Sequence, residues 1–174
     1  MALWKLDTDH SEIEFKVRHL MISVVKGRFR TFDVSLDSEV EDLSDARIKV
    51  AIDINSIDTQ NEQRDQHLRS ADFFDAGTHP HITFTSTKIS HRYKNEYDLE
   101  GELNIKGVSH TVTLLAELGG VARDPWGNAK VGYTVRGSIN RSDYGLTWNA
   151  ALEAGGVMVS EEVRFTANVQ FIKS

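Results

Sequence analysis

The chain has 174 residues, a formal net charge of −6 and no cysteine. This length predicts a single domain that spans residues 1–174, because domains contain roughly 100–200 residues. The missing cysteine excludes disulfides, thiolate nucleophiles and iron–sulfur clusters, and the acidic balance argues against non-specific binding of nucleic acid.

Alternation of apolar and polar residues dominates the chain. It runs through residues 13–19, 32–36, 48–54, 82–84, 97–105, 112–118, 131–139 and 163–171, with a shorter candidate at 4–6. Apolar residues at every second position are typical of strands with one buried and one solvent-exposed face, and this pattern predicts an antiparallel sheet. Eight such strands close into a barrel or stack as a sandwich. We favour the barrel, because closure removes exposed sheet edges.

One segment departs from this alternation. Thr59-Gln60-Asn61-Glu62 has the form of a capping box, and residues 60–69 contain a single large apolar residue, Leu68. This composition predicts a short surface helix within a helical insertion around residues 60–75. Phe73 and Phe74 follow the helix, and we expect this pair to hold it on the barrel.

Three histidines have both a functional and a structural interpretation. His79 and His81 could face one way on a strand and bind a metal, but no third ligand follows at a suitable spacing. We therefore favour a polar turn that enters a strand. His19 continues the apolar face of residues 13–19 and should point inward, where it would satisfy a structural hydrogen bond or orient a ligand.

Two charged clusters also leave two interpretations open. Arg64 and His67 share one helical face, with Asp65 beside them, which fits an acid–base group or an exposed helix with local ion pairs. Arg141 and Asp143 follow a strand and form either a structural pair or part of an anion site.

Motifs of nucleophilic and nucleotide chemistry are absent from the sequence. It has no Gly-x-Ser-x-Gly, no phosphate-binding glycine-rich loop and no His-Glu-x-x-His, which argues against a hydrolase or nucleotide enzyme. An eight-stranded barrel is filled by its own side chains or holds one small ligand. The inward-facing Ile, Val, Leu, Phe and Tyr residues would make that ligand apolar.

The sequence also carries an expectation about compartment. No stretch approaches the about 20 apolar residues of a membrane-spanning helix, and residues 1–7 lack the pattern of a signal peptide. We expect a cytoplasmic protein that does not span a membrane, or a periplasmic one if a leader has been removed.

Short motifs along the whole chain carry a family resemblance. They include Trp4-Lys5-Leu6-Asp7, His19-Leu20-Met21-Ile22-Ser23, Ser56-Ile57-Asp58-Thr59, Arg64-Asp65-Gln66-His67-Leu68, Asp72-Phe73-Phe74-Asp75, Gly101-Glu102-Leu103 and Arg141-Ser142-Asp143-Tyr144-Gly145-Leu146. In this order and spacing they resemble the YceI family of lipocalin-like polyisoprenoid-binding proteins. The resemblance implies an all-β, extended eight-stranded antiparallel lipocalin-like barrel with an apolar tunnel. It also implies an isoprenoid or similar amphiphile in the tunnel, with its polar head at one mouth, and a homodimer.

These observations together predict a binding protein rather than an enzyme, with no metal and no cofactor other than a bound isoprenoid lipid. The residues expected near the ligand head group are His19, Arg64, His67, Arg141 and Asp143. Those expected to line the tunnel are Phe15, Val17, Ile52, Phe84, Leu103, Tyr133, Val135, Phe165 and Val169. One alternative is an enzyme that acts on an isoprenoid-type substrate through Arg64, Asp65 and His67. The other is a stress or interaction module without a ligand.

Overall fold

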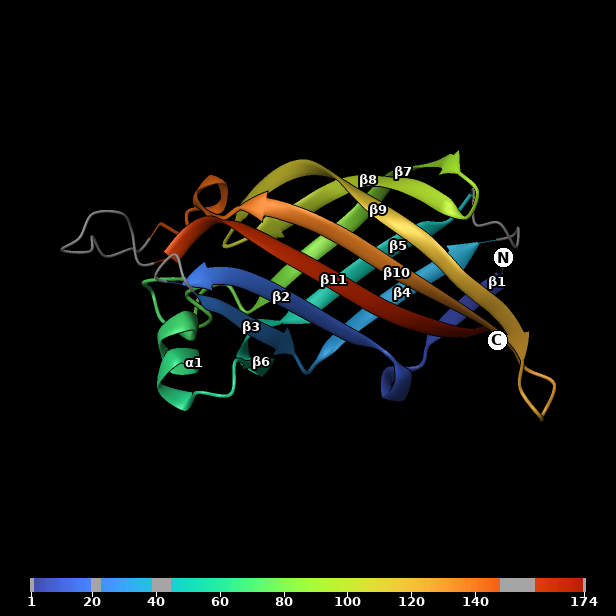
Figure 1. Cartoon of the computed structure of the whole chain (residues 1–174), viewed down its shortest axis with the longest axis horizontal. Helices are drawn as coiled ribbons and strands as arrows, with labels where there is room; N and C mark the ends of the chain where they lie inside the picture. The colour runs from blue at the N-terminus through green and yellow to red at the C-terminus, as the bar shows by residue number, and fades with distance from the viewer. Residues whose placement is uncertain (1, 20–22, 39–44, 148–158, 174) are drawn as a thin grey trace.

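Eight antiparallel strands close into a barrel in the computed structural model, which describes residues 2–19, 23–38, 45–147 and 159–173 (Figure 1). Strand β1 pairs with β4 on one side and with β11 on the other, and this pairing closes the ring. The predicted eight-stranded barrel is therefore confirmed. In ring order the strands are β1 (Ala2–Leu6), β4 (Phe32–Ser38), β5 (Arg47–Asp53), β7 (His81–Tyr93), β8 (Glu96–Ile105), β9 (Val108–Arg123), β10 (Ala129–Asn140) and β11 (Val159–Lys173).

Three further strands lengthen the barrel wall. They are β2 (Glu12–His19), β3 (Ser23–Phe29) and β6 (Ile57–Asp58). Strand β11 pairs with β2 through residues 159–168 and with β1 through residues 171–173, so β1 and β2 lie one after the other along it. Strand β3 extends from β2, and β6 pairs with β3. Along β11, the barrel wall is therefore longer than β1 or β2 alone.

The helix α1 (Glu62–Arg69) lies at one end of the barrel, next to β6 (Figure 1). Its N-cap is Asn61, whose side chain accepts a hydrogen bond from the Arg64 backbone N–H at 3.0 Å. The helix is confirmed, but the predicted capping box at Thr59 is wrong. Gln60 has a φ of 62°, so the chain turns between Thr59 and the helix and places the cap two residues later.

Two phenylalanines hold the segment after α1 against the barrel. Phe73 is buried, and the ring centroid of Phe74 lies 6.4 Å from that of Phe29 on β3. The predicted anchoring pair is therefore confirmed. None of the described helices is long and apolar enough to cross a membrane.

The core consists of two clusters inside the barrel. One lies under α1 and includes Ile54, Phe73 and Tyr144, all buried. The other lies around β1 and includes Trp4 and Leu36. The strand residues of both clusters follow from alternation, because every second side chain of a strand points into the barrel. Ile54 and Tyr144 join the first cluster from 3-10 helices, and Phe73 joins it from the turn after α1.

Candidate ligand-binding cavity

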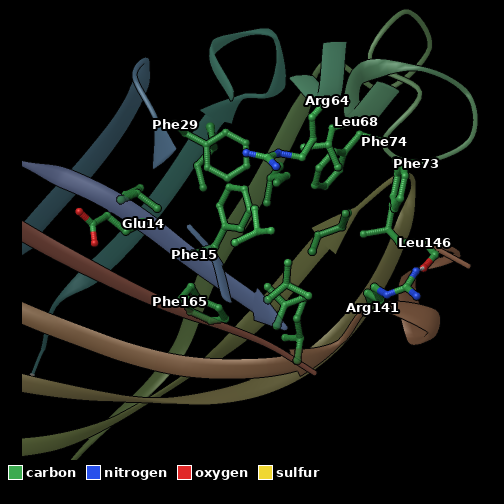
Figure 2. A pocket seen from close by; sticks show the side chains of 18 of the residues that line it. Glu14, Phe15, Phe29, Arg64, Leu68, Phe73, Phe74, Arg141, Leu146 and Phe165 are labelled. Atoms are coloured by element: carbon green, nitrogen blue, oxygen red, sulfur yellow. Dashed lines mark hydrogen bonds between the residues drawn. The ribbon is translucent and has the colours of Figure 1, made fainter. Parts of the chain in front are cut away.

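The larger of two chambers inside the barrel has a volume of about 470 Å³ and extends under α1 (Figure 2). Ligand sites in proteins commonly measure about 300–1,000 Å³. Most of its lining is apolar and comes from β2, β3, β8, β10, β11 and the segment after α1. The apolar side chains that line it are Ile13, Phe15, Val17, Val25, Phe29, Ile52, Leu68, Phe73, Phe74, Ile82, Leu103, Ile105, Ile139, Leu146, Val163 and Phe165.

A smaller chamber of about 150 Å³ lies farther along the barrel. A cavity of this size can hold a benzene ring. Its described lining contains no charged residue and includes Val34, Leu36, Phe84, Tyr133 and Val135. Four of the described residues line both chambers and form the boundary between them: Ile13, Ile52, Leu103 and Phe165.

Three phenylalanine rings lie over glycines of neighbouring strands. A Cβ atom added at Gly27 would come within 2.2 Å of the Phe15 ring, and one at Gly101 within 2.5 Å of the Phe84 ring. A Cβ at Gly137 would come within 2.7 Å of the Phe165 ring. Because no side chain stands at these three positions, each ring packs against the barrel wall.

The structure places all nine residues predicted to line a tunnel on the walls of these chambers. Those on the larger chamber alone are Phe15 and Val17, and those on both are Ile52, Leu103 and Phe165. Those on the smaller chamber alone are Phe84, Tyr133, Val135 and Val169. Contact of these residues with a ligand stays a prediction.

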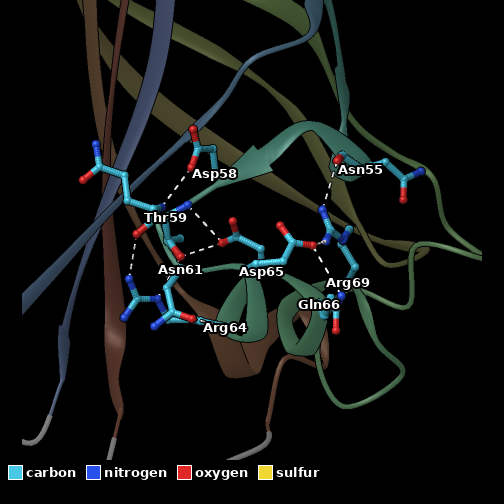
Figure 3. A network of polar contacts seen from close by, with 10 residues as sticks. Asn55, Asp58, Thr59, Asn61, Arg64, Asp65, Gln66 and Arg69 are labelled. Atoms are coloured by element: carbon cyan, nitrogen blue, oxygen red, sulfur yellow. Dashed lines mark hydrogen bonds and ion pairs between the residues drawn. The ribbon is translucent and has the colours of Figure 1, made fainter.

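Arg64 lies at the edge of the larger chamber, where α1 meets the barrel. Its Nε donates to Thr59 Oγ1 at 2.8 Å and its Nη2 to the Thr59 carbonyl at 2.7 Å (Figure 3). The hydroxyl and the backbone N–H of Thr59 in turn donate to the carboxylate of Asp65. Thr59 thereby fixes the direction of the Arg64 side chain.

His67 is the second predicted head-group residue on this chamber. Its Nε2 lies 2.9 Å from Oδ2 of Asp72, and its ring packs edge-on against Phe73 at 5.1 Å. Asp65 is buried against Thr59 instead of facing His67. Arg64 and Asp65 are thus joined through Thr59, whereas the Nε2 atom of His67 lies against Asp72, so the three residues of the acid–base alternative do not share one set of contacts.

Arg141 lines the larger chamber from the 3-10 helix η3 (Arg141–Tyr144), and it is only 3% exposed. Its Nε donates to the Ser160 carbonyl at 2.9 Å and its Nη1 to the Leu146 carbonyl at 2.6 Å. Glu161 lies 3.9 Å from its Nη2. Burial lowers the pKa of Arg141, and the charge of Glu161 opposes that shift.

One predicted head-group residue, Asp143, is not among the described residues that line the two chambers. Asp143 is exposed, and its backbone carbonyl lies 2.8 Å from Nε2 of His110. Burial raises the pKa of the Tyr144 hydroxyl, and the charge of Asp143 adds to this. The side chain of His19 lies outside the described part of the structure. In the described ranges, no three His, Asp or Glu side chains gather as metal ligands would, and this includes His79 and His81.

Sequence reasoning missed several residues of the larger chamber, among them Phe29, Phe74 and Leu146. Phe29 belongs to β3, a strand that the alternation did not reveal. Phe74 was expected only to anchor the helix, and Leu146 follows a turn. The ring of Phe29 contacts those of Phe15 and Phe74. These contacts would have identified Phe29 and Phe74 as lining residues, but they can be recognised only once the strand order is known.

A closed antiparallel barrel with an apolar interior and two arginines near one end is a lipocalin-like binding fold. The chain belongs to the YceI family, because the model of the YceI-like domain matches residues 4–171.

Known proteins agree with this assignment. A UPF0312 protein of Staphylococcus epidermidis is 44% identical over 172 residues, which cover 98% of each chain. The YCEI protein of Campylobacter jejuni is 33% identical in a solved structure that covers 90% of each chain, with a TM-score of 0.78. A polyisoprenoid-binding domain from Saccharophagus degradans shares the fold over 98% of each chain, with a TM-score of 0.75 and 15% identity.

Proposed function

We propose that this protein binds a long-chain isoprenoid or a similar amphiphilic lipid inside the barrel, as a carrier, storage or sequestering protein and not as an enzyme. The apolar chain occupies the larger chamber and extends toward the smaller one. The polar head lies near Arg64 and His67, where α1 meets the barrel.

One observation carries this proposal: a chamber of about 470 Å³ is lined mostly by apolar side chains, and most of its polar lining residues lie at α1, namely Asn61, Gln63, Arg64 and His67. Its other two charged lining residues are Glu14 on β2 and Arg141 on η3. In Figure 2 the Arg64 side chain extends from α1 on the same side as Phe29, whereas Arg141 lies beside Leu146. Such a distribution suits an amphiphile, because one end of the molecule is apolar and the other polar. The polyisoprenoid-binding domain of the same fold supports this choice of ligand class.

The apolar wall can supply the binding free energy. Each methylene that leaves water for an apolar site gains about 0.8 kcal/mol. A chain of several isoprene units therefore offers enough free energy to exceed the cost of ordering the ligand. Polar contacts at α1 would orient the ligand more than they would hold it.

Mass spectrometry of the protein purified from its own host tests the proposal. We expect the native spectrum to show a bound mass that organic extraction removes and identifies as an isoprenoid or related lipid. Incubation of the loaded protein should return this lipid chemically unchanged, since no turnover is proposed. An empty protein that also gains no thermal stability from added prenols would refute binding and favour the ligand-free module.

We extend the proposal to a homodimer, which the family resemblance implies. Sedimentation velocity at micromolar concentration should then give twice the mass of the chain. A single species with the mass of one chain would contradict the dimer and leave the ligand proposal intact.

A further inference from the structure

The two chambers meet at a boundary that contains one aromatic side chain. Among the four residues that line both chambers, Phe165 is the only ring, and it lies on β11 (Figure 2). Phe15 lines only the larger chamber and Phe84 only the smaller one. Phe165 is therefore the aromatic side chain that stands at this boundary, together with the aliphatic Ile13, Ile52 and Leu103.

Strand register explains where that ring lies. Phe165 pairs with Gly137 on β10 and with Phe15 on β2, and Phe15 pairs in turn with Gly27 on β3. The Phe165 ring leans over Gly137, while the Phe15 ring leans over Gly27. The two adjacent rings thus lean away from each other along the wall, and the lumen between them stays open.

Gly137 is what permits this arrangement. A Cβ at this position would lie 2.7 Å from Cζ of Phe165 and 2.6 Å from Cδ2 of Leu114. Both atoms are the far ends of side chains, so they can move without displacing the backbone. An added methyl group projects from the inner face of the wall, and it would lift the Phe165 ring into the lumen.

We propose that Phe165, held against the wall over Gly137, determines the chain length that the cavity accepts. With the ring against the wall, an apolar chain passes from the larger into the smaller chamber, so the protein prefers ligands long enough to occupy both. This inference rests on the proposed function, and it adds the residue pair that selects the ligand by length.

Binding of linear prenols with two, three and four isoprene units, measured by isothermal titration, tests the inference. Wild-type affinity should rise with each unit, because more of the chain is buried. Gly137→Ala should bind the shortest prenol as the wild type does and the longest about tenfold more weakly, the loss expected when about two methylenes leave the apolar site. Binding of the shortest prenol also shows that the variant is folded.

Two further variants distinguish an effect that acts through the Phe165 ring from a general effect of replacing a glycine on β10. Gly132→Ala, on the same strand, places its Cβ no closer than 3.8 Å to another group and should keep the wild-type profile. Gly137→Ala combined with Phe165→Leu removes the ring atom that the new methyl group meets, and it should restore binding of the longest prenol.

The outcomes are distinct. An equal loss for all three prenols in Gly137→Ala, no loss, or no recovery in the double variant would overturn the role of Phe165 and leave the proposed function standing. A wild type that binds none of the prenols would refute the proposed function for this ligand class, and the length selection with it.

Discussion

Asp65 is a buried carboxylate whose hydrogen bonds are local. It is 4% exposed, and its Oδ1 lies 3.0 Å from the backbone nitrogen of Thr59 and also accepts from the Thr59 hydroxyl. The same hydroxyl accepts from Nε of Arg64, so one chain of hydrogen bonds joins the buried acid to the arginine at the chamber edge (Figure 3). A residue inside the helix therefore positions a side chain at the candidate site.

Asp65→Ala should lower the free energy of unfolding by about 1–3 kcal/mol, because it leaves the buried Thr59 N–H without its acceptor. Urea denaturation at neutral pH measures this loss. Gln66→Ala, at the exposed neighbouring position, should change the stability by less than about 0.5 kcal/mol. Equal effects of the two substitutions would show that the Thr59 contact contributes nothing specific.

Asp58 gives a prediction about pH. The backbone N–H of Gln60 and then the side chain of Arg30 hold the pKa of Asp58 below its ordinary value of 3.8. A carboxyl whose pKa is lower in the folded protein stabilises the fold above its unfolded pKa and loses this effect as the pH falls through the folded pKa.

Asp58→Asn should therefore be less stable than the wild type at pH 7, and the difference should shrink as the pH falls below 3.8. Urea midpoints of both proteins between pH 7 and pH 2.5 provide the measurement. A difference that stays constant over this range would mean that the substitution acts through packing and not through the charge.

At the scale of elements, α1 depends on the aromatic segment that follows it. The helix has few apolar residues and one buried side chain, that of Asp65, so its own face contributes little burial. Phe73 is 7% exposed and packs on His67, which connects the segment to the helix. We infer that the segment, more than the helix surface, holds α1 on the barrel.

Phe73→Ala should destabilise the protein by about 3–5 kcal/mol and release α1 before the barrel unfolds. Limited trypsin digestion should then cut faster after Arg64 and Arg69. Tyr93→Ala removes a ring that is 64% exposed on β7 and should leave the cleavage rate unchanged. Cleavage of Phe73→Ala at the wild-type rate would contradict this anchoring role.

The same elements show why most strands could be predicted and β3 could not. Most barrel strands have apolar side chains at alternate positions, so their sequence alone predicts them. In β3 the inward position between Val25 and Phe29 is Gly27, since the ring of Phe15 occupies that space. The alternation of apolar residues in β3 is therefore interrupted because of Phe15 on β2, and the sequence of β3 alone does not reveal this contact.

In the candidate site, too, features within one strand could be predicted from the sequence, and contacts between strands could not. Alternation predicts which side chains face inward, and it placed Phe15, Phe84 and Phe165 on the chamber walls. It does not predict which glycine lies opposite each ring, because that depends on strand register. The burial of Asp65 was also missed, since nothing in a polar helix shows that its carboxylate turns back to Thr59.

At the scale of the whole molecule, one strand, β11, contributes side chains to both chambers. Strand β11 runs past both β1 and β2, so its inward side chains line the barrel from one core cluster to the other. On this strand Val163 lines the larger chamber, Phe165 lines both and Val169 lines the smaller one. A ligand chain that follows β11 would therefore contact both ends of the apolar interior.

Val135→Trp tests whether a ligand uses this whole length. Val135 lines the smaller chamber and pairs with Ala116 and Ala167, whose small side chains leave room for an indole ring to project into the lumen. The variant should fold with a cost of about 1–3 kcal/mol from overpacking. It should lose most of the lipid that co-purifies with the wild type.

The same variant should also lose the stabilisation that a ligand brings. At 100 times its dissociation constant, a ligand adds about 2.7 kcal/mol to the stability of the wild type, and a blocked barrel would gain little. Ser138→Trp, at an exposed position of the same strand, should keep both the lipid and the thermal shift. If Val135→Trp carries as much lipid as the wild type, the chain does not enter the smaller chamber and the ligand lies wholly beneath α1.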